Sequence, residues 1–282
     1  MRTIGWIALD IDGTITNNKF SVPKKVSIYL KTLAKHSWKI IFTTGRSFSF
    51  SQKALSDIDF PYIICAQNGS VAIQMQEKNI IHKNYMLGSS LSHIEAAYDG
   101  LESDFLVYSG FEKGDFCYWR PQKFNDEQLA YLEDLKNRQT EDWHTVDEFD
   151  PIHIMECPLV KCFGKKDMLS KIQGRLEKLN IFETCMIKDP FDEEYYLLQV
   201  TAKGVSKGGC VAHLRDQIES GAYIIAAGDD YNDLSLLSIA NEKIVMPTAS
   251  AELKDIATIL APPVEELGII NALDIAIANM SK

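Results

Sequence analysis

The segment that most constrains the fold is an apolar strand that ends in two carboxylates. Ile4–Leu9 carries no charged side chain, and the run Asp10-Ile-Asp-Gly-Thr14 follows it directly. In an open parallel sheet, residues just beyond the carboxyl end of a strand line the crevice where ligands bind. Side chains two residues apart leave a strand on the same face, so Asp10 and Asp12 can address one reacting group. Two carboxylates this close repel each other, so we expect a divalent cation beside them.

The composition is that of an acidic globular protein. The chain has 282 residues, of which 46% are hydrophobic and 24% charged, which suits two domains of moderate size. The net charge of -10 opposes binding to nucleic acid or to anionic lipid. We find no leader pattern and no apolar run near the roughly 20 residues of a membrane span, so we expect a cytoplasmic protein without a membrane partner. Six cysteines without a C-x-x-C pair indicate reduced, packed thiols.

The first and last parts of the chain have the texture of a parallel α/β sheet. Apolar runs alternate there with amphipathic stretches, which is typical of repeated strand and helix units. The expected strands are Ile4–Leu9, Ile40–Thr43, Tyr62–Ala66, Tyr223–Ala227, Ile244–Met246 and Thr258–Leu260, and the expected helices Pro23–Lys35, a helix that includes Ser51–Ser56, and Val264–Met280. These segments predict one doubly wound α/β domain that the chain leaves and re-enters.

The middle of the chain differs in texture. Between about Ile81 and Gln199, aromatic residues are more frequent and no strand ends in carboxylates. We expect an inserted α+β domain, with an antiparallel sheet covered on one side. Its expected strands include Phe105–Tyr108 and Ile152–Met155, and its helices are Ser89–Tyr98, Asn125–Asn137 and Asp167–Leu179. The predicted division is therefore 1–81 with 200–282 for the first domain and 82–199 for the insertion.

Three further polar groups fall at expected strand or helix ends. Thr43-Thr-Gly-Arg46 follows the second strand, and Gly204-Val-Ser-Lys-Gly208 opens a helix. A lysine in the first turn of a helix is unfavourable unless an anion lies nearby, so Lys207 implies a compensating anion. Gly228-Asp-Asp-Tyr-Asn-Asp233 places three carboxylates after an apolar strand, where Asp229 invites a cation. Together these motifs supply the carboxylates, hydroxyl and lysine that phosphoryl transfer requires.

In this order, the motifs resemble those of the haloacid dehalogenase superfamily, specifically the Cof-like phosphatases of subfamily IIB. That group carries a large C2-type cap domain between its second and third motifs. The resemblance rests on Ala8–Ile15, Thr43–Arg46, Ala66–Gly69, Gly204–Gly208, Gly228–Asp233 and Ala249–Lys254. It implies a Rossmann-like core with the insertion as a substrate-specificity cap.

The resemblance also implies a function: a Mg²⁺-dependent hydrolase of a small phosphorylated metabolite, such as a sugar phosphate. Asp10 would attack phosphorus to form an aspartyl phosphate, and Asp12 would protonate the leaving group and later activate water. Thr44 and Lys207 would hold the phosphoryl oxygens. The other implied roles are metal binding by Asp10, the main-chain carbonyl of Asp12, Asp229 and Asp233, and substrate binding by Gly45, Arg46, Asn68 and Asn232.

The chain departs from the family pattern after Met246, where Pro247 and Thr248 replace the usual glycine and asparagine. Proline fixes its own backbone angle and lacks an amide donor, so we expect a stiffer loop. In the insertion, aromatic and basic residues are candidates to meet the leaving group, namely Tyr118, Trp119, Arg120 and Lys161.

Other functions share part of this pattern. A phosphomutase would use the same nucleophile but release an isomerised sugar phosphate. A non-enzymatic phosphoacceptor module also joins carboxylates, a hydroxyl and a lysine on a doubly wound sheet, but such modules are small. Asp12 favours turnover, because an acceptor alone needs no adjacent acid or base. A dinucleotide-binding domain is disfavoured because no G-x-G-x-x-G follows the first strand.

Overall fold

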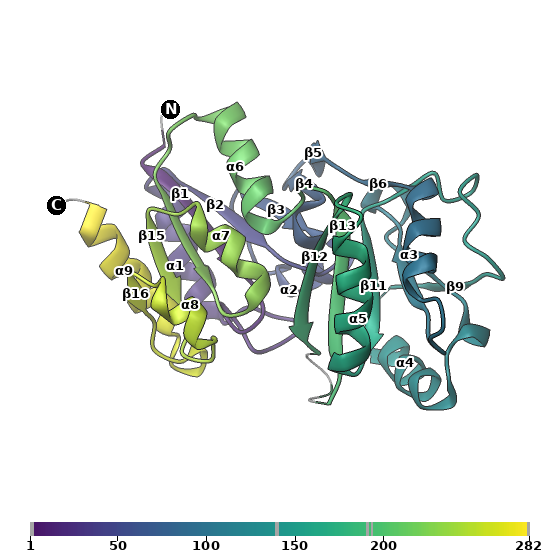
Figure 1. Cartoon of the computed structure of the whole chain (residues 1–282). Coiled ribbons are helices and arrows are strands. Elements are labelled where there is room, and N and C mark those ends of the chain that lie inside the picture. The colour runs from purple at the N-terminus through teal and green to yellow at the C-terminus, as the bar shows by residue number, and fades with distance from the viewer. Residues whose placement is uncertain (1–2, 139–140, 190–191, 193, 281–282) are drawn as a thin grey trace. The chain divides into compact units, whose positions relative to one another are not determined.

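The computed structural model describes residues 3–138, 141–189, 192 and 194–280 (Figure 1). Contacts between Cα atoms divide the chain into two compact units. The first comprises the chain up to Arg46, Ser51–Lys83 and the chain from Ser206 on; the second comprises Ser47–Phe50 and Asn84–Val205. The limits differ from the expected 1–81, 82–199 and 200–282 in that residues 47–50 group with the second unit and the chain returns at Ser206.

An eight-stranded sheet forms the centre of the first unit. Its spatial order is β16 (Ile259–Leu260), β15 (Glu242–Val245), β14 (Ile224–Gly228), β1 (Gly5–Asp10), β2 (Trp38–Thr43), β3 (Ile63–Ala66), β4 (Val71–Gln74) and β5 (Asn79–Lys83). The strands from β16 to β3 are parallel, as predicted. β4 and β5 form an antiparallel hairpin at the edge, which was not predicted.

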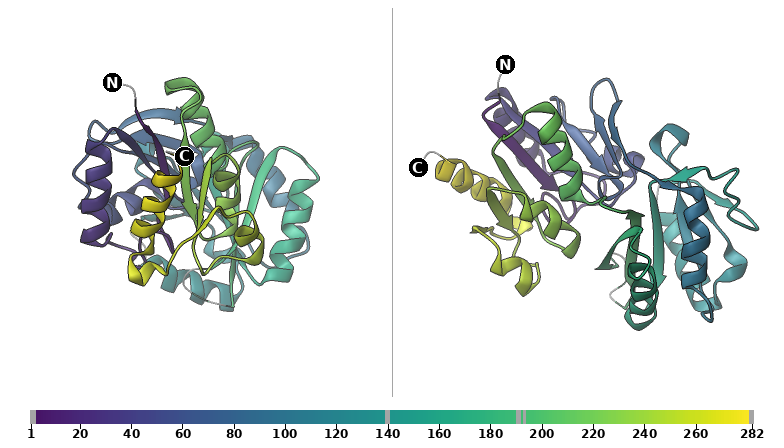
Figure 2. Two further views of the ribbon diagram at one scale, coloured as in Figure 1. Left: turned by 90° about the vertical axis from the view of Figure 1, so that its left-hand side faces the viewer. Right: turned by 45° about the horizontal axis from the view of Figure 1, so that its top comes forward.

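Helices cover both faces of this sheet (Figures 1 and 2). They are α1 (Lys24–Lys35), α6 (Lys207–Ile218), α7 (Leu234–Ser238), α8 (Ala251–Asp255) and α9 (Gly268–Met280). A further helix, α2 (Phe48–Ala54), begins in residues that group with the second unit. Val211 of α6, Leu236 of α7 and Leu253 of α8 share one core with the sheet, whereas α1 and α9 lie together on the other face. The central strands β1 and β14 are buried along their whole length, as expected when helices lie on both sides.

The second unit is built on a six-stranded sheet. Its spatial order is β12 (Phe182–Lys188), β13 (Tyr196–Ala202), β11 (Leu159–Gly164), β7 (Phe105–Tyr108), β8 (Cys117–Trp119) and β9 (Trp143–Thr145); β6 (Met86–Leu87) pairs separately with β10 (Glu156–Cys157). All pairs in the large sheet are antiparallel except β8 with β9. Its helices are α3 (Leu91–Ala97), α4 (Asp126–Arg138) and α5 (Lys166–Glu177).

Helices lie on both faces of this sheet, which corrects the expectation that only one side is covered. α3 and α5 pack against one face in a core that includes Val107 and Val160. α4 packs through Leu132 against the other face, which carries Leu106 and Leu159. Because successive side chains of a strand point to opposite faces, neighbours such as Leu106 and Val107 belong to different cores.

The strand expected at Ile152–Met155 is wrong, because Asp150 organises that segment into a turn. The Asp150 carbonyl accepts hydrogen bonds from the N–H groups of His153 and Ile154, at 3.1 and 2.8 Å. Its carboxylate accepts one from the Ile152 N–H at 2.8 Å. Such local bonds compete with strand pairing for the same amides. The other predicted elements are present, with ends shifted by a few residues.

The six cysteines are free thiols, and all except Cys185 are buried, as predicted. Among the described helices, none has both the length and the apolar character needed to cross a bilayer.

Candidate active site

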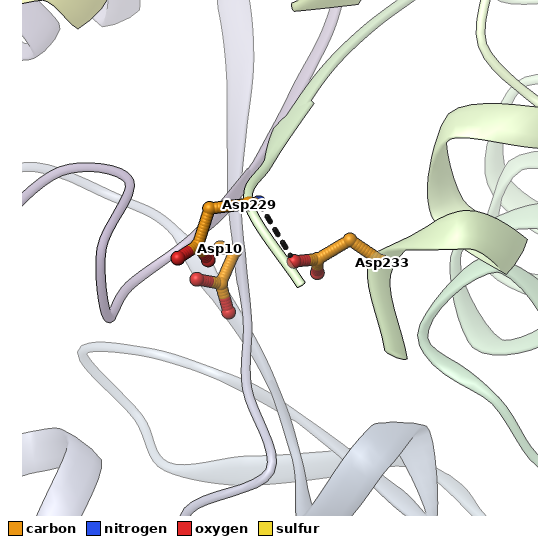
Figure 3. Close-up of side chains that lie close together, drawn as sticks. All are labelled: Asp10, Asp229 and Asp233. Carbon is orange, nitrogen blue, oxygen red and sulfur yellow. Dashed lines mark hydrogen bonds between the residues drawn. The ribbon is translucent and has the colours of Figure 1, made fainter. Parts of the chain in front are cut away.

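Three carboxylates meet at the carboxyl end of the parallel strands. Asp10 ends β1 and Asp229 follows β14, and these two strands are direct neighbours. Asp233 ends the single 3-10 turn Tyr231–Asp233 that comes next. One oxygen from each carboxylate lies within 4.8 Å of the others (Figure 3). The strand order thus brings together residues that are more than 200 positions apart in the chain.

Asp233 holds the loop that presents Asp229. Its Oδ2 accepts hydrogen bonds from the N–H groups of Asp229 and Asp230, at 3.0 and 3.1 Å. Gly228 makes this approach possible, because a Cβ there would lie only 2.4 Å from the Cβ of Asp233. The side chain of Asp233 is fully buried. Asp233 therefore stabilises the loop in addition to lying beside the other two carboxylates.

Lys207 lies between two of these carboxylates. It is the first residue of α6, and Ser206 caps that helix by accepting a hydrogen bond from the Gly209 N–H at 3.0 Å. The Lys207 Nζ donates to Oδ1 of Asp10 and to Oδ1 of Asp233, both at 2.6 Å. The anion that a lysine in the first helical turn requires is therefore a pair of aspartates within the chain.

The cluster carries more negative than positive charge. Within the described parts of the chain, Lys207 supplies the ammonium group that forms ion pairs with this cluster, to Asp10 and to Asp233. Burial, followed by the charge of Asp233, raises the pKa of Asp10 to about 8. Burial and the charge of Asp10 hold the pKa of Asp229 well above its usual range. Although burial opposes its charge, Asp10 and Asp233 raise the pKa of Lys207. A second cation, or protons, must therefore balance the carboxylates.

The residues present fit a hard divalent cation. Every acidic donor in the cluster offers oxygen, and neither histidine nor cysteine belongs to it. Mg²⁺ takes oxygen ligands, uses one or two carboxylates and keeps several waters. Gly13 lies against the Asp229 carboxylate, where a Cβ would come within 2.1 Å of Oδ2. The space beside Asp229 is thus kept free of side-chain carbon.

The side chain of Asp12 lies outside this carboxylate cluster. It is half exposed, and Arg46 binds it: Arg46 Nε donates to Oδ2 of Asp12 at 2.7 Å. Asp10 keeps a different partner, because Thr14 donates its hydroxyl to Oδ2 of Asp10 at 3.2 Å. Thr14 is fully buried, and its hydrogen bond to Asp10 was not predicted, although Thr14 belongs to the strand-end motif.

The loops after β2 and β3 are joined at the same edge of the sheet. Thr44 donates its N–H to the Cys65 carbonyl and accepts a hydrogen bond from the Asn68 N–H, both at 2.9 Å. Asn68 accepts a weak hydrogen bond from the Asn232 side chain at 3.4 Å. Gly45 is partly exposed beside Thr44. The structure thus gathers Thr44, Asn68 and Asn232, whereas it directs Arg46 to Asp12.

The two residues after Met246 that differ from the family pattern lie at the surface. Pro247 and Thr248 are exposed, in a turn closed by the Ala249 N–H, which donates to the Met246 carbonyl at 3.1 Å.

The candidates from the insertion have structural partners. Arg120 forms an ion pair with Asp104 at 2.7 Å and another with Glu95, and its guanidinium lies 4.0 Å from the centre of the Phe149 ring. Lys161 is buried on β11, with its Nζ 4.5 Å from the centre of the Tyr108 ring.

The two aromatic candidates also have neighbours in the fold. Trp119 is buried and donates from Nε1 to the hydroxyl of Thr145 at 3.1 Å. Tyr118 is partly buried and meets the Phe116 ring edge to face.

A doubly wound sheet thus carries aspartates at its carboxyl edge, with a lysine between two of them. The sequence model of haloacid dehalogenase-like hydrolases matches residues 7–273, and the chain belongs to that family.

Several distant relatives match over nearly the whole chain. The 5-amino-6-(5-phospho-D-ribitylamino)uracil phosphatase YwtE of Bacillus subtilis is 24% identical over 95% of this chain and 96% of its own. The structure of SMU.1108c from Streptococcus mutans covers 98% of this chain and 100% of its own, at 16% identity and a TM-score of 0.78. The subclass IIB sugar phosphatase BT4131 covers 96% of this chain and 98% of its own, at 19% identity and a TM-score of 0.72.

These matches confirm the family resemblance, the α/β fold class and the enzyme class, a phosphatase of the haloacid dehalogenase type. The individual roles of the site residues and the limits of the cap remain predictions.

Proposed function

We propose that the protein hydrolyses a small phosphomonoester of the sugar phosphate class. The phosphoryl group would be carried on Asp10 between the two steps of the reaction. The observation that supports this most is the environment of Asp10: a nearly buried carboxylate with Lys207 on one oxygen, Thr14 on the other and Asp229 beside it. The Asp10 carboxylate lies at the edge of the sheet, next to the ammonium group of Lys207, which can offset the negative charge of a phosphate dianion.

In the first half of the reaction, an Asp10 oxygen bonds to phosphorus as the bond to the leaving oxygen breaks. Asp12 supplies a proton to that oxygen. Lys207 and Thr44 hold the non-bridging oxygens of the phosphoryl group, where negative charge is spread in the transition state. Dividing one displacement into two steps through a carboxylate is an established form of covalent catalysis.

Mg²⁺, held by Asp10, Asp229 and the main-chain carbonyl of Asp12 with Asp233 nearby, would supply positive charge against the repulsion between Asp10 and an incoming phosphate. Two relatives whose names specify a sugar phosphatase or a phosphorylated ribityl compound support this choice of substrate class. We assign the insertion, residues 82–199 in the expected division, to recognition of the leaving group.

The test is a panel of sugar phosphates, with and without Mg²⁺, on the wild type and on Asp10→Asn. We expect phosphate release that EDTA abolishes and that Asp10→Asn lowers at least about 10³-fold, the scale of losing a covalent nucleophile. Equal release by both proteins would refute the proposal. An isomerised sugar phosphate in place of free phosphate would identify a mutase, and one phosphorylation without turnover would identify a phosphoacceptor.

A further inference from the structure

Arg46 binds the loop that carries Asp12 at two points. Its Nε and Nη2 both donate to the Asp12 carboxylate, one to each oxygen, and its Nη1 donates to the Lys19 carbonyl at 2.7 Å. The Arg46 side chain is only 6% exposed, whereas that of Asp12 is 50% exposed. A buried guanidinium therefore fixes a carboxylate that is itself open to water.

The backbone of Arg46 is anchored as firmly as its side chain. Its N–H donates to the Thr44 hydroxyl at 3.1 Å, and its carbonyl accepts from the Gln67 N–H at 2.9 Å. These bonds tie Arg46 to the ends of β2 and β3. Because β2 pairs with β1 up to the register Asp10 with Thr43, the sheet sets the place of the guanidinium relative to Asp10.

A two-point guanidinium contact restricts what Asp12 can do. Each carboxylate oxygen uses one lone pair for the guanidinium and retains a second for another donor. Asp12 can therefore still accept a hydrogen bond from water. Arg46 therefore occupies one side of the carboxylate and leaves the other side open, and on that open side Asp12 can exchange a proton with the leaving group or with water.

From this geometry we infer that Arg46 is a positioning residue for Asp12, and that with a leaving group that needs no proton it acts on the hydrolytic half of the reaction. The inference rests on the proposed function and replaces the expected role of Arg46 in substrate binding. In that half, the oxygen of water bonds to phosphorus while the bond from phosphorus to Asp10 breaks. The electron pair returns to the Asp10 carboxylate, and the proton of water passes to Asp12, which Arg46 holds in place.

The test separates the two halves of the reaction with p-nitrophenyl phosphate, whose leaving group departs without a proton. Arg46→Ala and Arg46→Lys are mixed with this substrate and Mg²⁺ in a stopped-flow instrument. We expect a burst of nitrophenolate near one equivalent per enzyme, larger than in the wild type. Steady-state turnover should then be about 10²-fold slower, the scale of misplacing a catalytic group. Lysine should not restore the rate, since its ammonium cannot bind both oxygens at once.

Free guanidinium ion provides a second readout that a merely structural role would not give. It should raise the steady-state rate of Arg46→Ala and leave Arg46→Lys unchanged. Arg175→Ala is the matched control, because Arg175 also donates to main-chain carbonyls, those of Ala97 and Asp99 at 2.7 and 2.9 Å, in the second unit. It should show the wild-type burst and no response to guanidinium.

Two results would overturn the inference while the wild type remains active. A raised KM with unchanged kcat and no added burst would place Arg46 on the substrate. Equal slowing of both phases in the two Arg46 variants, with unchanged melting temperatures, would mean that Arg46 does not act through Asp12. A wild type that releases no phosphate from any ester would instead refute the proposed function itself.

Discussion

The Asp229 carboxylate packs directly on the backbone of Gly13, so closely that residue 13 has no room for a Cβ. Gly13 also has a φ of +70°, a conformation that other residues rarely adopt. The glycine of the first motif is therefore tied to the fourth motif, although the two are far apart in sequence. Their contact shapes the proposed metal site.

Gly13→Ala should weaken Mg²⁺ binding, because its methyl group must displace the Asp229 carboxylate. We expect at least about a tenfold rise in the Mg²⁺ dissociation constant, the usual scale for disturbing the support of a metal ligand, measured by titration calorimetry. Gly221→Ala is the control, since Gly221 has a similar φ of +78° but open space around it. Equal weakening in both variants would show that backbone strain, and not the contact with Asp229, is responsible.

Lys207→Met should destabilise the protein by about 3–5 kcal/mol, because it leaves buried carboxylates without their ammonium partner. The loss should be greater at pH 8 than at pH 5, since the carboxylates can take up protons at the lower pH. Urea unfolding in EDTA measures it. Lys203→Met, in an exposed pair with Glu183, should cost under about 1 kcal/mol. A loss that is the same at both pH values would contradict the explanation.

The stabilisation given by Mg²⁺ should increase with pH. The pKa of Asp10 lies near 8 in the folded protein against an ordinary value of 3.8, and Asp229 is shifted in the same direction. Their contribution to the free energy of unfolding is fully present below the ordinary value and is lost as pH rises through about 8. Mg²⁺ replaces the lost protons, so its effect on the melting temperature should be small at pH 5.5 and large at pH 8.5. A constant effect would be evidence against metal binding at Asp10.

Arg120→Met should destabilise the second unit by about 3–5 kcal/mol, since it strands the buried carboxylate of Asp104. Arg138, which pairs with Asp134 on the surface of α4, provides the matched control. Arg138→Met should cost under about 1 kcal/mol. Chemical denaturation of the full chain measures both. If Arg120→Met unfolded like the wild type, the ion-pair network around Arg120 would have no structural importance.

The residues that sequence reasoning placed well stand at the ends of regular elements. Asp10 and Asp229 end or follow strands that are apolar throughout, and Lys207 begins a helix, so strand order and helix polarity alone predict their meeting. The depth of their burial could not be predicted, because it depends on how closely glycines such as Gly13 and Gly228 let the loops approach.

The contacts that were not predicted depend on which residues the tertiary fold brings together. Arg46 could bind a substrate phosphate or a carboxylate, and the local sequence is the same in either case. The hairpin of β4 and β5 follows directly after the Asn68 loop and consists of short strands. The run Ile152–Met155 has the apolar residues of a strand, but a single carboxylate at Asp150 turns the chain instead.

The segment before helix α6 limits where the chain between the two units can be altered. β13 ends at Ala202, and only Lys203–Ser206 separates it from the buried lysine that begins α6. An insertion within Lys203–Ser206 would disturb the Ser206 cap next to Lys207, whereas the crossing after β5 is adjacent in sequence to no residue of the carboxylate cluster. Fluorescent or affinity tags inserted within the chain therefore belong near Asn84 and not near Gly204.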